Sequence, residues 1–80
     1  MLFAIRITHL TGRQVGNAHW PIDHYVVWKP SDFGAPIPTA GPVVGATLFD
    51  SADTAHAAAV KLMCVFEGVH VVVDEFRRLE

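Results

Sequence analysis

The stretch FDSADTAHAAAVKLMCVFEG, residues 49–68, decides the fold, because it predicts the one helix of the chain. Asp50 or Ser51 can serve as the N-cap, and Asp53 in the first turn suits the positive end of the helix dipole. Gly68 fits the C′ position, since glycine readily takes the left-handed dihedrals that end a helix. The residues between these signals are good helix formers. The face expected to pack on a core carries Ala55, Ala59, Leu62 and Phe66, flanked by Ala58 and Val65.

Strands are predicted on both sides of this helix. Residues 2–10, 24–29 and 69–76 are rich in β-branched and aromatic side chains. Residues 43–49 predict a weaker strand, because Gly45 interrupts it. The order is then β-β-β-α-β, which indicates a single α+β domain over residues 1–80. We expect a two-layer sandwich, in which one α-helix lies on a three- to four-stranded, mostly antiparallel sheet.

The predicted loops are residues 11–22 and 30–42, and the second holds four of the five prolines. Long loops without helix or strand pattern tend to be functional or mobile in so small a domain.

The last predicted strand raises a covering problem, because it is apolar on both faces. Val71 and Val73 point to one side, while Val72 and Phe76 point to the other. One helix, about 10 Å wide, can shield at most one face of the sheet from solvent. Three coverings of the second face are open: the proline-rich loop with Phe33 and Ile37 as plugs, a second copy of the chain, or a different protein.

The outer stripe of the helix has two readings. It runs through Asp53, Ala57, Val60, Cys64 and Glu67. Small apolar residues on a helix surface are common and need no explanation. They would also let the helix of another chain approach closely.

Composition argues against several classes of function. The formal net charge is −2, and the basic residues are scattered, so nucleic-acid binding is not expected. The residues that could bind nucleic acid in that case are Arg6, Arg13, Arg77 and Arg78. No apolar run approaches the ~20 residues of a membrane span, and no signal peptide is recognisable. A single cysteine indicates a reducing compartment, so we expect a cytoplasmic protein.

Chemistry-bearing residues form no recognised signature. His9, His19 and His24 are the candidates for a small metal- or ligand-binding protein, which stays open as the alternative function. Their spacing matches no zinc motif, so no metal site or cofactor is predicted. Cys64 lies in mid-helix, away from features that would activate a thiol. No catalytic motif is present, and we expect no enzyme activity.

The segment GNAHWPIDHYVVWKP, residues 16–30, is instead typical of a binding surface. Tryptophan and tyrosine dominate interface hot spots, and Pro21 and Pro30 stiffen the segment. One of Trp20 and Trp28 is expected to complete the core, but not both, because each buried indole N–H would need a partner. We predict a non-catalytic module that acts by protein–protein association, either with itself or with a larger partner. The predicted partner-binding residues are Trp20, His24, Tyr25, Trp28, Phe33 and Phe76.

In its size, acidity and lack of catalytic motif, the chain resembles small single-domain proteins of phages and mobile elements, including anti-CRISPR and other anti-defence inhibitors. That resemblance implies a protein that binds a larger host complex and blocks it.

Overall fold

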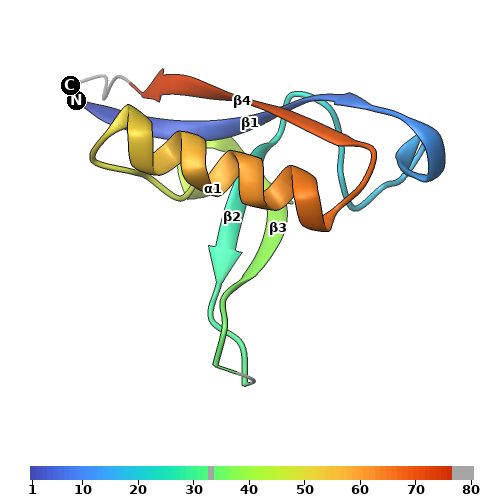
Figure 1. The fold of residues 1–80 in the computed structure, drawn as a ribbon, viewed down its shortest axis with the longest axis horizontal. Coiled ribbons are helices and arrows are strands. Elements are labelled where there is room, and N and C mark those ends of the chain that lie inside the picture. The colour runs from blue at the N-terminus through green and yellow to red at the C-terminus, as the bar shows by residue number, and fades with distance from the viewer. Residues whose placement is uncertain (33, 77–80) are drawn as a thin grey trace.

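A computed structural model describes residues 1–32 and 34–76. It contains a four-stranded antiparallel sheet in the order β3-β2-β1-β4 and one α-helix. The predicted α+β fold with the order β-β-β-α-β is therefore confirmed. The elements are β1 (Leu2–Leu10), β2 (Tyr25–Lys29), β3 (Ile37–Gly41), α1 (Ala52–Val65) and β4 (Val69–Phe76), with short 3-10 helices at Gly12–Gln14 and Val43–Gly45 (Figure 1).

The helix begins where its predicted N-cap places it, but it ends earlier than predicted: its last residue is Val65 and Phe66 is the C-cap, so Gly68 lies one position beyond the C′ position predicted for it. The hydroxyl of Ser51 accepts a 3.1 Å hydrogen bond from the backbone N–H of Thr54, so Ser51 is the N-cap. Gly68 has a φ of 92°, which permits the turn into β4. A Cβ at this position would collide with the carbonyl oxygen of Thr11, so the position requires glycine for two reasons.

The core lies between α1 and the β1–β4 half of the sheet. Alternate residues of each strand point to this side, as the period of two requires. The buried core consists of Ile5, Ile7, Trp20, Val26, Ala59, Leu62, Val69 and Val71. Trp20 is 7% exposed and packs on Phe66, with the two ring centroids 5.1 Å apart. One tryptophan therefore serves the core, as expected.

The third strand lies earlier in the chain than predicted. Residues 37–41, assigned to a loop because of their prolines, form β3, while residues 43–49 hold a 3-10 turn and a single bridge at Phe49. The physical reason is the position of β3 at the edge of the sheet. Pro38 lies opposite Trp28 in β2, and an edge strand tolerates a residue without a backbone N–H.

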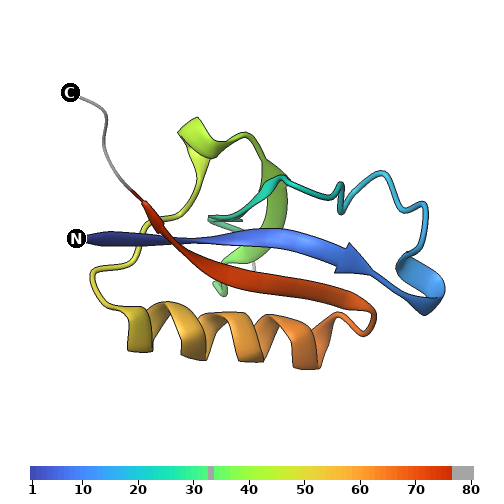
Figure 2. The same ribbon diagram turned by 90° about the horizontal axis from the view of Figure 1, so that it is seen from above.

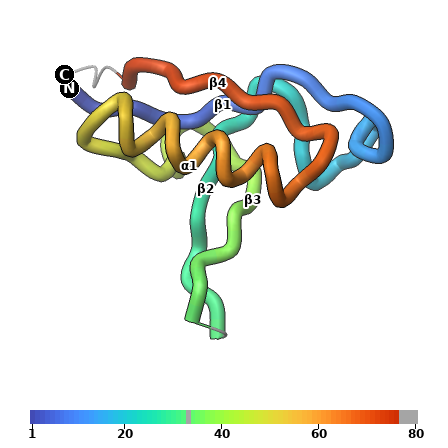
Figure 3. The backbone as a smooth tube through the Cα atoms, viewed as in Figure 1, coloured from blue at the N-terminus to red at the C-terminus, as the bar shows by residue number. Residues whose placement is uncertain are grey.

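The β2–β3 hairpin diverges from the rest of the sheet. Its tip extends past α1 and away from β1 and β4 (Figures 1 and 3). Residues 47–49 enter the gap between β1 and β2. The N–H of Thr47 bonds to the carbonyl of Val26, and Phe49 exchanges two backbone bonds with Phe3 in β1. This segment holds the hairpin at an angle to the β1–β4 pair.

The proline-rich segment does not cover the second face of the sheet. Residues 37–41 pair with β2 at the sheet edge, and Ile37, proposed as a plug, is exposed. The chain leaving β3 lies on the side of β1 away from β4 (Figure 2), and Phe49 pairs there with Phe3 of β1. Phe33, the other proposed plug, lies outside the described residues.

Candidate functional site: a groove between the helix and the hairpin

α1 covers only half of the sheet face on which it packs. α1 packs mainly on β4 and β1, and the β2–β3 hairpin projects beyond it (Figure 1). Neighbouring strands lie about 4.8 Å apart, so a helix about 10 Å wide covers only two of them. A four-stranded sheet needs two helices on one face, and the described chain contains one.

A groove of about 720 Å³ occupies the uncovered half. One wall is α1, which contributes Ala58, Lys61, Leu62 and Val65, together with the C-cap residue Phe66. The other wall and the floor are Trp28, Ser31, Ala35, Pro36, Ile37, Pro38, Thr47 and Phe49. Trp28 meets Phe49 edge to face, with ring centroids 5.8 Å apart. The lining is therefore aromatic and aliphatic, the composition of a surface that binds by excluding water.

Exposed apolar side chains mark the two rims of the groove. Ile37 on β3 is 49% exposed, and Val65 on the last turn of α1 is 66% exposed. Lys61 is the single charged residue in the lining and forms no ion pair with any residue of 1–32 and 34–76. The groove is thus an apolar channel with one positive charge at its border.

A second hollow adjoins the groove along β3. It has a volume of about 600 Å³ and combines residues of the loop before β2 with the edge strand. His19, Trp20 and His24 line it, together with Ala18, Pro21, Pro38, Thr39, Ala40, Gly41 and Pro42. Pro38 borders both hollows. The aromatic segment of residues 16–30 therefore contributes to two neighbouring depressions as well as to the core.

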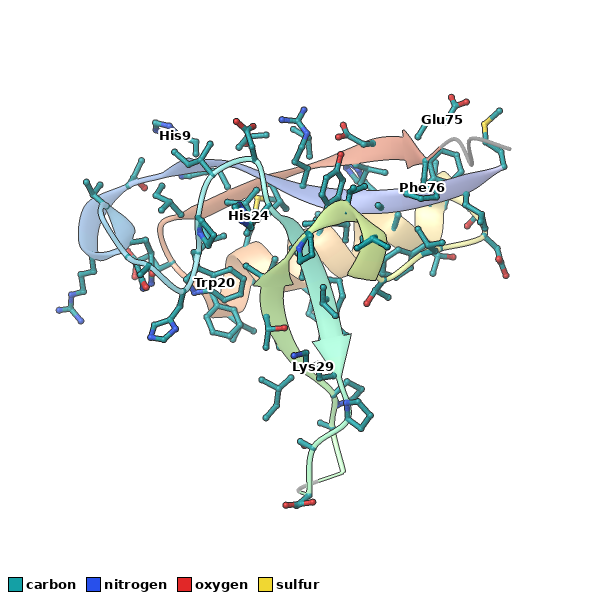
Figure 4. All side chains as sticks on the ribbon, turned by 180° about the vertical axis from the view of Figure 1, so that it is seen from behind. His9, Trp20, His24, Lys29, Glu75 and Phe76 are labelled. Carbon is teal, nitrogen blue, oxygen red and sulfur yellow. The ribbon has the colours of Figure 1, made fainter. Side chains whose placement is uncertain are left out.

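The predicted partner-binding residues divide between the two sides of the sheet. Trp28 lines the groove, while Trp20 and His24 line the adjoining hollow. Tyr25 and Phe76 belong to the opposite side, and Phe33 lies outside the described residues. Figure 4, viewed from that opposite side, shows Trp20 and His24 near each other and Phe76 at the far end of the sheet.

The opposite side carries a polar cluster at its centre. The Arg6 guanidinium contacts the Asp74 carboxylate at 2.6 Å and that of Asp23 at 3.2 Å. The Tyr25 hydroxyl donates a 3.4 Å hydrogen bond to Asp74. The hydrogen bond that Arg6 donates to Asp74 and the negative charge of that carboxylate raise the pKa of Arg6, so the cation persists throughout the physiological range. The stability that comes from this raised pKa is fully present below the ordinary arginine pKa and is lost as the pH rises through the higher pKa of the folded state.

The three histidines of the alternative function do not converge. His19 and His24 share the second hollow, whereas His9 lies at the end of β1 beside His70, with ring centroids 5.6 Å apart. Residues 1–32 and 34–76 contain no group of three histidine, cysteine or acidic side chains placed to hold a metal ion. Among the same residues, no helix is long and apolar enough to cross a membrane.

Several groove residues were not predicted as binding residues. Val65 flanks the predicted core face of the helix, and Ile37 is a plug in only one of the three coverings left open for the opposite face. The signal that could have identified the helical wall is the stripe Ala58, Lys61, Leu62, Val65, which repeats at helical spacing beside the core stripe. The position of Ile37 depends on the angle of the hairpin, which no local pattern encodes.

No known protein family, curated protein or solved structure matches this chain significantly.

Proposed function

We propose that the protein is a non-catalytic binding module whose groove between α1 and the β2–β3 hairpin accepts an amphipathic helix of a partner protein. The observation that carries this proposal is the half-covered sheet. The groove lies where a second helix would complete the layer, and its lining is apolar. Docking an amphipathic helix in an apolar groove is a recurrent mode of recognition.

The edge of β3 argues against a strand as the occupant. In β2, the carbonyl of Val26 and the N–H of Trp28 bond to Thr47, on the side away from β3. The backbone groups of the alternate residues Tyr25, Val27 and Lys29 therefore point toward β3. The residues paired with them are Gly41, Thr39 and Ile37, which leaves Pro38 and Ala40 facing outward. Pro36, Pro38 and Pro42 all fall in the outward register and offer no N–H. Ala40 therefore supplies the one outward N–H between residues 36 and 42, too little for strand addition.

Lys61 gives the occupant a charge preference. An acidic side chain on the flank of the incoming helix would meet this cation at the groove border, while leucine-sized side chains fill the space over Trp28 and Phe49. A protein that binds a helix of a larger complex in this way could block that complex. Blocking a host complex is what the resemblance to anti-defence inhibitors implies.

A library of amphipathic helical peptides tests the proposal without knowledge of the natural partner. Selection on the wild-type protein should enrich peptides with an apolar i, i+3, i+4, i+7 face and an acidic flank. Ile37→Glu and Val65→Glu place a charge on each rim and should lower affinity for the enriched peptides at least tenfold. Val44→Glu is the matched control, because Val44 is 88% exposed and lies outside the groove lining.

Two sets of results distinguish whether the peptides bind in the groove. Loss of binding in both rim variants and its retention in Val44→Glu supports the groove. Failure to enrich any saturable binder, or equal affinity in all three variants, contradicts it.

A further inference from the structure

The two edges of the sheet differ in their capacity to pair with another strand. Prolines limit the outward edge of β3, whereas β4 contains none. Native proteins usually protect a long edge strand with proline, a bulge or a covering segment, because unpaired backbone groups recruit other strands. The pairing of β4 with β1 has one irregularity, between Ile7 and His9, and is regular from Val71 onward. The outer backbone of Val71 and Val73 is therefore open to another strand.

The backbone bonds of β1 identify which groups of β4 are open. Ile7 donates to His24 and accepts from Asp23, and Phe3 exchanges both of its bonds with Phe49. The odd-numbered residues of β1 thus face β2, and the even-numbered residues face β4. Arg6 lies opposite Val72, and Ala4 lies opposite Asp74.

The alternation turns the backbone groups of Val71 and Val73 outward. Among residues 1–32 and 34–76, the backbone groups of these two residues have no partner, because β4 pairs with β1 alone. They present two N–H donors and two carbonyl acceptors in a row. Between them, the side chain of Val72 is 38% exposed on the face opposite α1.

We propose that a second copy of this chain pairs with the β4 edge, in antiparallel register about a two-fold axis through Val72. Val71 then pairs with Val73 of the second copy, and Val73 with its Val71, which closes four backbone hydrogen bonds. The result is a continuous eight-stranded sheet. A two-fold contact is self-complementary, so one strand supplies both halves of it.

Side chains select this register over its neighbours. With Val72 on the axis, the two exposed valines meet, and His70 lies across from Asp74 of the second copy. Opposite-charge and polar pairs at such positions favour pairing. A shift of two residues in one direction sets His70 against Val72, and a shift in the other sets Asp74 against Val72. Both alternatives lose the complementarity.

The contact is independent of the proposed helix-binding groove. The groove lies at the β2–β3 half of the sheet, and the β4 edge lies at the other end of the strand order. The dimer would therefore present two grooves, and a variant that damages one surface leaves the other intact.

Disulfide trapping tests the register directly. The variant Val72→Cys, in a Cys64→Ser background, places two thiols at a non-hydrogen-bonded pair, where the Cα atoms are about 4.5 Å apart. That separation suits a disulfide. Mild oxidation with a glutathione buffer should convert most of this variant to a covalent dimer. Val44→Cys in the same background, on a fully accessible turn, should oxidise at least tenfold more slowly.

The noncovalent dimer is tested by sedimentation of the full chain at concentrations between about 10 and 500 μM, which detects dimers with dissociation constants in the micromolar range. Wild-type protein should approach twice its mass of 8.8 kDa. Val72→Glu should remain monomeric, because two carboxylates would meet on the axis. Its fold should persist, since Arg6 lies opposite position 72 in the same chain. Val65→Glu should dimerise like the wild type.

Three results would overturn the proposal. They are a wild-type monomer throughout that range, a Val72→Glu variant that still dimerises, and equal oxidation of the Val72→Cys and Val44→Cys variants. In none of these cases is the groove affected, so peptide binding remains a separate measurement.

Discussion

The two halves of the helix-facing side of the sheet are built from similar residues but have different surroundings. Over β1 and β4, valine and isoleucine side chains are buried under Ala55, Ala59 and Leu62 of α1. Over β2 and β3, Trp28 and the proline-rich strand border an open groove. The sheet therefore has more apolar surface than one helix can cover. The covered half stabilises the fold, and the uncovered half is available for a partner.

The largest expected effect lies in the covered half. Leu62→Ala removes a side chain that is 3% exposed and leaves a cavity between α1 and the sheet, so the free energy of unfolding should fall by about 3 kcal/mol. Chemical denaturation measures this loss. Val60→Ala, on the outer face of the same helix, should change stability by less than about 1 kcal/mol. Similar losses in the two variants would contradict the assignment of the core to this half.

A second substitution tests the turn that brings β4 beneath α1. Gly68→Ala forces a side chain into a left-handed conformation and against the carbonyl of Thr11, so we expect a loss of about 2 kcal/mol. Gly45→Ala is its control, because Gly45 has neither a positive φ nor any atom near the added Cβ. If the two variants unfold at the same denaturant concentration, the close contact between this turn and Thr11 is absent in solution.

The smallest stability effect is expected in the uncovered half. Ile37→Glu and Val65→Glu change side chains that are already exposed, so the free energy of unfolding should stay within about 0.5 kcal/mol of the wild type. Thermal melts of both variants measure this. A loss of several kcal/mol would mean that the groove is closed in the free protein and belongs to the core.

Local signals in the sequence are sufficient to predict the helix and three of the strands. The cap at Ser51 and the β-branched content of residues 2–10 each act over a few neighbours, and both predictions are confirmed. Gly68 has the predicted positive φ, although the helix ends before it, at Val65. The third strand required nonlocal information. Prolines at residues 36, 38 and 42 argue against a strand only when both of its edges are paired, and the sequence does not show that β3 lies at an edge.

The candidate site was predictable only in part. Tryptophan at residue 28 was expected to bind a partner, and it lines the groove. Its wall on α1 and its rim at Ile37 depend on the angle of the hairpin, which the bonds of Thr47 and Phe49 hold. Those bonds join residues that are distant in the chain, so no periodicity reveals them. The far side was expected to be largely apolar, but the ion pair of Arg6 with Asp74 occupies its centre.

We propose that another chain binds to the uncovered half of the sheet. The most direct test of this proposal is to titrate a selected helical peptide into isotope-labelled protein and to follow each amide and indole resonance. We predict that the Trp28 indole and the amides of Ile37, Val65 and Phe66 shift together and saturate, while Val44 and Val72 stay unchanged. Saturable shifts centred on Val44 or Val72, with the groove signals unmoved, would contradict the account.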